Sequence, residues 1–426
     1  MVIKTQESSN KASIRNVLFA LGVAVLTLMM VKTNGISSTT YRAILASSGL
    51  IVVSILMYFN VARRLINTKL FVAFLCYCIF VFFFSFLQHG LSTTIGALLS
   101  QITFFVGILI TFVVAEISEN KGAIKLLFYM TLIVWLYENI QLIILCLSNP
   151  NIGRMISAHS ADYTIVSSIG SPYGIAEGSS LIAIILFKFA IDKDYYIKPL
   201  FRLALLIVVL IFATAVYQTQ STITSIIMML FLGIALIMNI TRGNYSRRVK
   251  RVLLLCLAIA LSVFLFRERI GYFLISKFSN YGSVFNIRMY EIGRFAAGYS
   301  SSNDMQARVD LFTQSWQSIW KHPIFGNLYN GGSISGEHCH VLDVVSDYGL
   351  LGSIPYLLIF VYFQKILKQR LENYDFFIWL PVVIMSFSNP LRIYQTFFSI
   401  FYICPLCYFV FNSFKKESLI DSYPDT

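Results

Sequence analysis

The sequence predicts an all-α protein that crosses a membrane many times, and its composition and the length of its apolar segments are the observations behind this prediction. Of the 426 residues, 57% are hydrophobic and 12% are charged, whereas a soluble globular protein carries about 25% charged residues. Many windows hold about 18–22 apolar residues, the length that crosses a bilayer core of roughly 30 Å. The chain is therefore expected to be a polytopic membrane protein.

The apolar segments predict twelve spanning helices. In chain order they lie at about residues 15–32, 41–60, 69–88, 93–116, 122–147, 174–191, 199–217, 222–240, 250–266, 348–367, 375–388 and 393–412. The first follows Lys4, Lys11 and Arg15 and lacks a small-residue cleavage site, so it is expected to be a retained helix and not a signal peptide.

The distribution of basic residues predicts how these helices are oriented. Loops rich in Lys and Arg stay in the cytoplasm. With the N-terminus inside, the cytoplasmic segments hold 22 of the 33 basic residues and the short outer segments hold 4. The other 7 lie in segment 267–347, and loops of that length are exempt from the charge rule. Both termini are therefore expected in the cytoplasm, and orientation explains the net charge of +13 without a nucleic-acid partner.

This topology divides the chain into three parts. Residues 1–266 hold helices one to nine, 267–347 form an extracytoplasmic loop or cap, and 348–426 hold the last three helices. A second outer segment, about 148–173, joins helices five and six. Long outer loops on a compact bundle are usually functional, so functional residues are expected in these two segments.

The end of the long outer segment predicts an amphipathic helix. Residues 306–320 place Val309, Phe312, Trp316 and Ile319 at helical spacing, so this helix is expected to lie against the membrane or the bundle. The breakers that follow it in HPIFGN (322–327) end it.

Two histidines occur in GEHCHVLDVVSDYGLLG (336–352). If residues 338–352 form one continuous helix, His338 and His340 point about 200° apart and cannot serve one site. His338 then shares a face with Leu342, Val345, Gly349 and Gly352, while His340 shares the other face with Asp343 and Asp347. The glycines permit close helix approach, so His338 is expected on the packing face, pointing towards whatever the bundle encloses.

The residues alone leave two interpretations of His338. It can act as a general base, because imidazole titrates near working pH, at about 6.5. It can equally be a capping or interface histidine. A zinc site of His338, His340 and Asp343 is disfavoured, because the helical geometry separates the ligands.

Three segments resemble the bacterial O-antigen ligase and Wzy-type polysaccharide polymerase superfamily. HCHVLDVVSDYGLLG (338–352) is similar to a family signature in which His is followed by Asn, Ser or Gln, then nine residues and Gly-x-x-Gly. RVDLFTQSWQSIWKHPIFG (308–326) and RMISAHSADYTIVSSIGSPYGIAEGSS (154–180) resemble the family's two arginine-bearing outer segments. Twelve helices with a long outer loop before the tenth also fit. Cys339 departs from the pattern, where a small amide or hydroxyl is usual.

The resemblance implies a metal-independent, inverting glycosyltransferase of the bacterial cytoplasmic (inner) membrane, with its active site on the extracytoplasmic face. Its substrates would be undecaprenyl pyrophosphate-linked oligosaccharides, with His338 as the catalytic base. Arg154 and Arg308 match the family's arginines, and a guanidinium suits pyrophosphate oxygens. Membrane lipids, a chain-length regulator and a flippase are the partners that such an enzyme implies.

Four further residues are candidates for substrate binding. Glu138 and Glu177 fall within predicted spans, where a carboxylate usually faces a cavity or a partner. Glu138 can bind sugar hydroxyls or pair with an outer arginine, and Glu177 lies close in sequence to the Arg154 segment and can orient it. Tyr329 can stack on a sugar ring or join an interfacial aromatic belt. His340 is the fourth.

Neither acidic residues nor cysteines predict a metal site or a cofactor. The first outer loop, TNGISSTT, has no acid, and the only Asp-x-Asp, at 192–194, lies in a predicted cytoplasmic connector. Cys404 and Cys407 form a CxxC without a second pair.

Three functions are therefore weighed. A polymerase of O-antigen or capsule type is the leading one, and an O-antigen ligase of the same superfamily is the closest alternative. A lipid-linked oligosaccharide flippase or other transporter is the third. Transporters tend to show internal repeats and polar residues at mid-membrane, and the sequence shows neither clearly.

Overall fold

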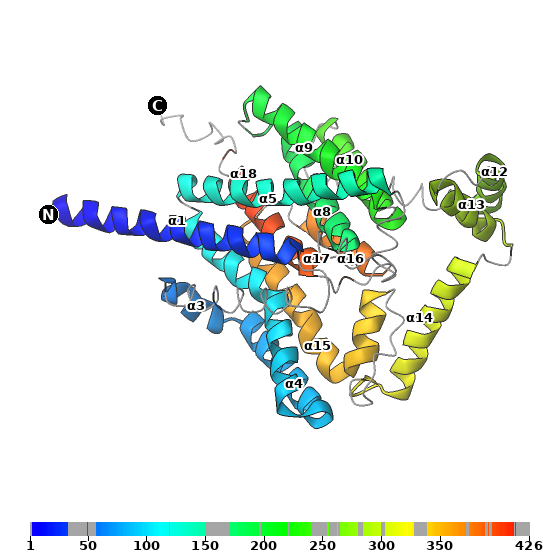
Figure 1. Cartoon of the computed structure of the whole chain (residues 1–426), viewed down its shortest axis with the longest axis horizontal. Helices are drawn as coiled ribbons and strands as arrows, with labels where there is room; N and C mark the ends of the chain where they lie inside the picture. Colours follow the sequence, from blue (N-terminus) through cyan, green and yellow to red (C-terminus); the bar gives the residue numbers. More distant parts are fainter. Residues whose placement is uncertain are drawn as a thin grey trace, which may run out of the picture.

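The structure is a computed structural model of the chain. It describes residues 2–32, 49, 57–118, 120–149, 171–195, 197–219, 221–240, 254, 262, 265–279, 284–299, 303–327, 339–371, 375–387, 391, 394–412 and 414. Over these residues the protein is all-helical and has no β-strand (Figure 1).

The described α-helices follow one another in chain order. They are α1 (Val2–Lys32), α3 (Phe59–Ile66), α4 (Lys69–Ile117), α5 (Lys121–Ser148), α8 (Pro172–Ile191), α9 (Pro199–Gln218), α10 (Thr222–Ile240), α12 (Arg267–Lys277), α13 (Val284–Ala296), α14 (Asn303–Lys321), α15 (His340–Lys368), α16 (Leu380–Ser386), α17 (Tyr394–Phe398) and α18 (Cys404–Asn412). Two π-helical turns, η2 (Asp375–Trp379) and η3 (Ser399–Ile403), precede α16 and α18.

Within the described residues, eight helical segments are long and apolar enough to cross a membrane. They are Lys69–Leu87, Thr94–Ile117, Lys121–Ser148, Pro172–Ile191, Pro199–Gln218, Ile223–Ile240, His340–Lys368 and Gln395–Asn412. Ile14–Met30 and Phe376–Ser386 are shorter apolar helices at two other predicted spans. The predicted spans 41–60 and 250–266 lie almost wholly outside the described residues. A polytopic membrane fold is thus supported, while the count of twelve and the sidedness stay predictions.

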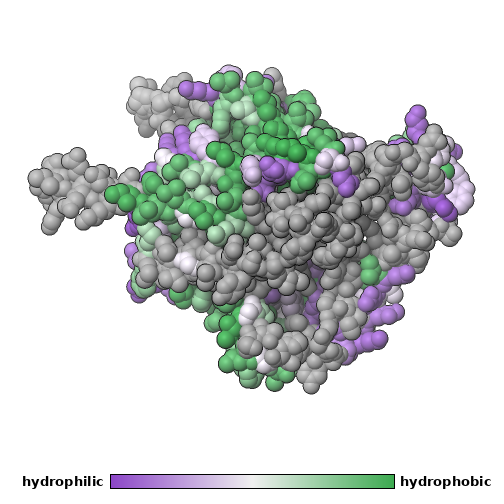
Figure 2. All heavy atoms as spheres, in the orientation of Figure 1, coloured by the Kyte–Doolittle hydropathy of each residue, from purple (hydrophilic) through white to green (hydrophobic). Residues whose placement is uncertain are grey.

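The outward faces of the bundle are apolar. Figure 2 shows hydrophobic side chains gathered over the face formed by α5, α9 and α10. On α9, for example, Leu203, Ile207 and Leu210 are exposed. Polar residues such as Ser179 and Thr131 are instead buried. This inside-out pattern is what a helix bundle in lipid requires, because unpaired polar groups are costly there.

Helix α8 forms the centre of the bundle, and nearly all of its residues are buried. It has apolar residues on every side, which is typical of a fully enclosed helix, and it also buries the polar residues Glu177, Ser179 and Lys188. Ser171 caps it by accepting a hydrogen bond from the Gly174 amide. A Cβ on Gly178 would lie 2.4 Å from the Ser399 hydroxyl and 2.5 Å from the Trp135 ring. Gly178 therefore allows α5 and η3 to approach α8 closely.

The long helix α4 is two spans joined at one residue. Gly90 has φ 74°, a left-handed conformation that glycine adopts at little cost. The predicted spans 69–88 and 93–116 are thus confirmed as helical, with the break at Gly90 between them.

The described part of the predicted outer segment 267–347 holds three whole helices, α12, α13 and α14, and the first turns of α15, which begins at His340 and not at the predicted residue 348. Helices α12 and α13 pack closely at Gly271. A Cβ on this residue would lie 2.6 Å from the Gly293 carbonyl oxygen. Figure 1 shows this pair set apart from the main bundle, with α14 leading back from it to α15.

Candidate functional site

The structure describes the side chains of three of the seven predicted site residues. Glu138, Glu177 and His340 are all buried. Three others, His338, Arg154 and Tyr329, lie outside the described residues. Arg308 belongs to α14 by its backbone, and its side chain is not among those described. The structure therefore describes side chains around the predicted site, and not those of His338, Arg154 and Arg308.

The start of α15 is tied to α14 by one carboxylate. Asp343 accepts a hydrogen bond from the Cys339 amide through Oδ2 at 3.0 Å, and from the Ser315 hydroxyl through Oδ1 at 2.8 Å. The Asp343 carboxylate pairs with the Cys339 amide, a backbone donor at the helix start that has no partner within the helix. Its negative charge also interacts favourably with the positive end of the helix dipole. Cys339, the residue that directly follows His338, is thus held in place against α14.

The Cys339 side chain makes a further contact. It is buried, and its thiol donates to the Ser386 carbonyl at the end of α16, at 3.7 Å. Burial raises the pKa of the Cys339 thiol. A raised pKa keeps the sulfur protonated at neutral pH, so Cys339 is a packing and anchoring group, not a nucleophile.

A second tie comes from two glycines whose backbones cross. Gly326, after α14, has φ 67°, and Gly349, within α15, has φ 59°. A Cβ on Gly326 would lie 2.3 Å from the Asp347 carbonyl oxygen, and one on Gly349 would lie 2.4 Å from the Ile324 carbonyl oxygen. We call this pair, Gly326 with Gly349, the glycine crossing. At these two positions only glycine can adopt the left-handed backbone and also fit into the space that the neighbouring backbone leaves.

Backbone hydrogen bonds hold the glycine crossing together. The amides of Leu350 and Leu351, freed by the break at Gly349, donate to the carbonyls of Pro323 and Ile324 at 2.9 and 3.0 Å. The condition of one continuous helix over 338–352 is therefore not met: the described helix begins at His340 and changes direction at Gly349. A helical wheel drawn across that break does not place Gly349 or Gly352 on the face of His338.

The prediction of close helix approach is confirmed at Gly352 alone. A Cβ there would lie 2.3 Å from the Phe80 ring of α4. Gly349 makes its close approach to the chain after α14 instead.

The first turns of α15 bury the face that was expected to point away. His340, Asp343 and Asp347 are buried, while Leu342 and Val345 are only half-buried. The expectation that the Leu342 side of the helix would pack is therefore wrong. The reason is that Asp343 and its neighbours hydrogen-bond to α14, and these bonds decide which face turns inward.

His340 packs within this buried face. Its Nε2 lies 3.2 Å from the Tyr356 hydroxyl, and its ring lies edge-on to Phe397 with centroids 6.3 Å apart. These contacts support a role in joining α15 to α17 more than one in holding a substrate.

Asn327 adds a third tie between α14 and α15. Its amide nitrogen donates to the Ser318 hydroxyl of α14 and, at 3.2 Å, to the Ser346 hydroxyl of α15. Asn327 is buried. Asn327 was not among the predicted site residues, although it directly follows Gly326 in the turn HPIFGN after α14.

A buried polar seam also runs through the middle of the bundle. On α5 and α8, Trp135 Nε1 donates to Ser179 Oγ, and Ser179 Oγ donates to Asn139 Oδ1, both at 2.8 Å. Asn139 Nδ2 then donates back to the Trp135 carbonyl at 2.7 Å. Such bonds between helices replace the hydrogen bonds that water would provide.

The seam continues into the last helices of the chain. Glu177 Oε2 accepts from Thr396 Oγ1 at 2.7 Å, and the hydroxyls of Thr131 and Tyr402 lie 2.8 Å apart. Tyr402 belongs to η3, and π-helical turns often mark functional positions. We define the polar seam by the hydrogen-bonded side chains just described, Thr131, Trp135, Asn139, Glu177, Ser179, Thr396 and Tyr402.

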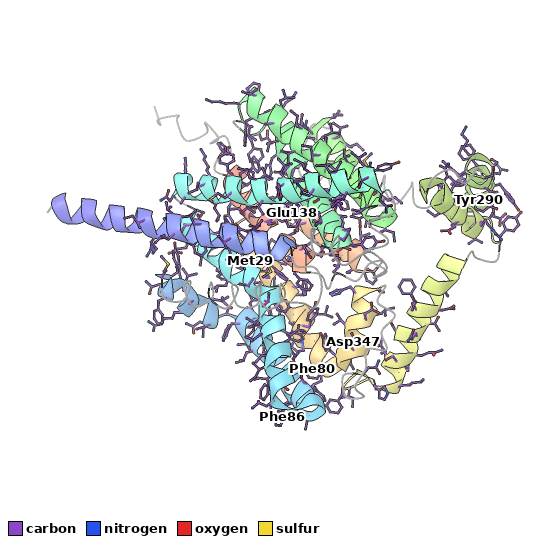
Figure 3. The ribbon with its side chains drawn as sticks, viewed as in Figure 1. Met29, Phe80, Phe86, Glu138, Tyr290 and Asp347 are labelled. Carbon is purple, nitrogen blue, oxygen red and sulfur yellow. The ribbon has the colours of Figure 1, made fainter. Side chains whose placement is uncertain are left out.

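Glu138 lies beside the seam, fully buried on α5. Figure 3 shows it near the middle of this helix, inside the bundle. The sequence did not show this set of buried polar residues clearly. Single small polar residues in an apolar run carry no local sign of the partners they will meet.

In the connector after α8, Asp192 is only partly exposed, while Lys193 and Asp194 are exposed. Asp192 Oδ2 lies 3.7 Å from the Lys188 ammonium, which also sits over the rings of Phe189 and Tyr195 at 4.2 and 5.2 Å. Asp192 thus neutralises a buried lysine. Among the residues that the structure describes, no group of three His, Cys, Asp or Glu side chains could hold a metal ion.

No protein-family model matches this chain, and no curated protein matches it significantly.

Proposed function

We propose that this protein is a polymerase of bacterial surface polysaccharide. It transfers a growing glycan from undecaprenyl pyrophosphate to a lipid-linked repeat unit, on the extracytoplasmic face of the bacterial cytoplasmic membrane. A chain-length regulator and a flippase are its expected protein partners. The proposal rests on the three segments that resemble the ligase and polymerase superfamily, and on a fold whose apolar helices suit a membrane.

The chemistry assigns one role to each predicted residue. A hydroxyl of the acceptor sugar attacks the anomeric carbon that bears the pyrophosphate, and His338 takes the proton of that hydroxyl. The new glycosidic bond forms as the carbon–oxygen bond to pyrophosphate breaks, with inversion at the carbon. Arg154 and Arg308 hold the departing diphosphate, because guanidinium forks match its oxygens and stay charged.

One observation supports a glycan transferase of this superfamily. Two of the segments that carry the resemblance, 308–326 and 338–352, meet in space through Gly326 and Gly349. The helix that carries Arg308 and the residue that follows His338 therefore belong to one hydrogen-bonded unit. A catalytic base and an anion-binding arginine need such a shared, rigid support.

A reaction with purified protein tests the proposal. The protein is mixed in detergent with lipid-linked repeat units, and the glycan length is measured. Parent protein is expected to lengthen the chains, and His338→Ala is expected to leave single repeat units. Long chains made by a normally folded His338→Ala variant would show that His338 is not the base.

The same assay separates the alternatives. A ligase would leave repeat units unpolymerised and would move glycan only when a lipid A core or a protein acceptor is added. A transporter is favoured by the polar seam, since buried polar side chains at mid-bundle occur in transport proteins. It would make no product in detergent, where there are no two compartments to connect.

A further inference from the structure

Helix α14 has four sides, and one of them carries the half-buried Phe312 and Ile319. At 100° per residue, Leu311, Ser315 and Ser318 lie on a second side, and both serines are buried. A third side carries the exposed polar residues Asp310, Gln314, Gln317 and Lys321. The fourth side, which we call the tryptophan stripe, consists of Val309, Thr313, Trp316 and Trp320.

The face that packs against the protein is the serine face. Ser315 bonds to Asp343 of α15, and Ser318 accepts from Asn327. Figure 1 shows α14 lying beside the first turns of α15. A helix in water buries its large apolar residues and exposes its serines. On α14 the two serines are buried and two tryptophans are exposed, while Leu311, Phe312 and Ile319 are half-buried, so the exposed apolar side is the one that suits an apolar medium.

The tryptophan stripe is the exposed apolar face. Trp316 is 53% exposed and Trp320 is 69% exposed, and their rings meet edge to face at 5.9 Å. The Thr313 hydroxyl, the stripe's one aliphatic hydroxyl, donates to the Val309 carbonyl at 2.8 Å. That bond removes the main cost of placing Thr313 in an apolar layer.

The tryptophan stripe is continuous with the outer surface of two spanning helices. After α14, Ile324 and Phe325 are exposed, and the Phe325 ring lies 5.3 Å from that of Phe84 on α4. Through the backbone bonds at the glycine crossing, Ile324 also adjoins Leu350 and Leu351, both exposed on α15. An apolar surface thus runs from α14 onto helices that are themselves apolar enough to cross a membrane.

We propose that the tryptophan stripe lies in the lipid bilayer, at the boundary between headgroups and acyl chains. Indole rings are amphipathic and collect at that level. The adjoining polar face then meets headgroups and water, with Lys321 able to reach a lipid phosphate. The partner of this surface is therefore lipid, and α14 anchors the outer segment to the membrane beside α15.

Tryptophan fluorescence tests the proposal without reference to glycan chemistry. The chain has four tryptophans; Trp135 and Trp379 are buried, and the other two form the stripe. The full-length protein is reconstituted into phosphatidylcholine vesicles whose acyl chains are brominated close to the headgroup. These lipids are expected to quench a large part of the emission, and iodide in the water is expected to quench little.

Matched variants assign the quenching to the stripe. Trp316→Phe with Trp320→Phe is expected to abolish most of the quenching by brominated lipid, whereas Trp379→Phe is expected to leave it unchanged. Strong quenching by iodide would overturn the proposal in favour of a water-facing helix. Resistance to both quenchers would also overturn it, because the stripe would then be covered by protein, such as a second copy of the chain.

Discussion

The glycine crossing leaves no room for a side chain at Gly326 or Gly349. Gly349→Ala is expected to destabilise the protein by more than the roughly 1–2 kcal/mol that a left-handed backbone costs an ordinary residue, because the new methyl would also meet the Ile324 carbonyl. Gly298→Ala is the matched control, since Gly298 has φ 80° but open space around it. Thermal unfolding in detergent measures both. Equal losses would mean that the crossing adds nothing beyond backbone strain.

Asp343 is the residue on which the start of α15 depends. Asp343→Ala removes the acceptor of both the Cys339 amide and the Ser315 hydroxyl, so a loss of about 1–3 kcal/mol is expected, as for a buried cap with charged hydrogen bonds. Ser315→Ala removes only one of the two bonds and is expected to cost less. If the two variants unfold at the same temperature, the bond to the Cys339 amide contributes nothing.

The Cys339 thiol yields a prediction about reactivity. Because burial raises its pKa, the thiolate fraction at neutral pH is smaller than for a free cysteine, and alkylation slows accordingly. Iodoacetamide is expected to modify Cys339 slowly in folded protein and quickly after denaturation, as measured by peptide mass spectrometry. Equal rates would mean that the thiol is accessible and ionised in the folded state.

Elements differ in how much of their structure the sequence predicts. The helical period over 306–320 correctly predicted α14, and apolar length correctly predicted most of the long apolar helices. The orientation of α14 was not predictable, because it is set by the hydrogen bonds of Ser315 to Asp343 in α15 and of Ser318 to Asn327. The break at Gly349 was also missed, because helical periodicity is inferred from the pattern of side chains and glycine has no side chain.

Helix α8 offers a test of packing at the scale of an element. Gly178→Ala is expected to destabilise the bundle, because its Cβ would overlap Ser399 of η3 and Trp135 of α5. Gly233→Ala, in α10, has nothing within 4 Å of the new atom, so it is expected to be neutral or slightly stabilising. Unfolding temperatures compare the two variants. A tolerated Gly178→Ala would show that α5 or η3 can shift to make room.

At the scale of the whole molecule, the predicted topology can be tested by chemical labelling. Lys277→Cys, in α12, is expected to react with a membrane-impermeant maleimide on intact spheroplasts, because segment 267–347 is predicted to lie outside. Lys193→Cys, in the exposed connector after α8, is expected to react only after lysis. The opposite pattern would invert the topology and end the proposed function.

The ties between α14 and α15 have a consequence for the chain that joins them. Asn327 and Cys339 both bond to α15, at Ser346 and Asp343, within a single turn of that helix. The eleven residues between them, 328–338, therefore start and finish at neighbouring points. Their number is not set by a distance that the chain must span. Since the entropy of closing a loop grows only with the logarithm of its length, insertions and deletions within 328–337, which leave His338 next to Cys339, are expected to leave the helical scaffold intact. The length of that stretch can therefore change without altering the packing of the helices in the core.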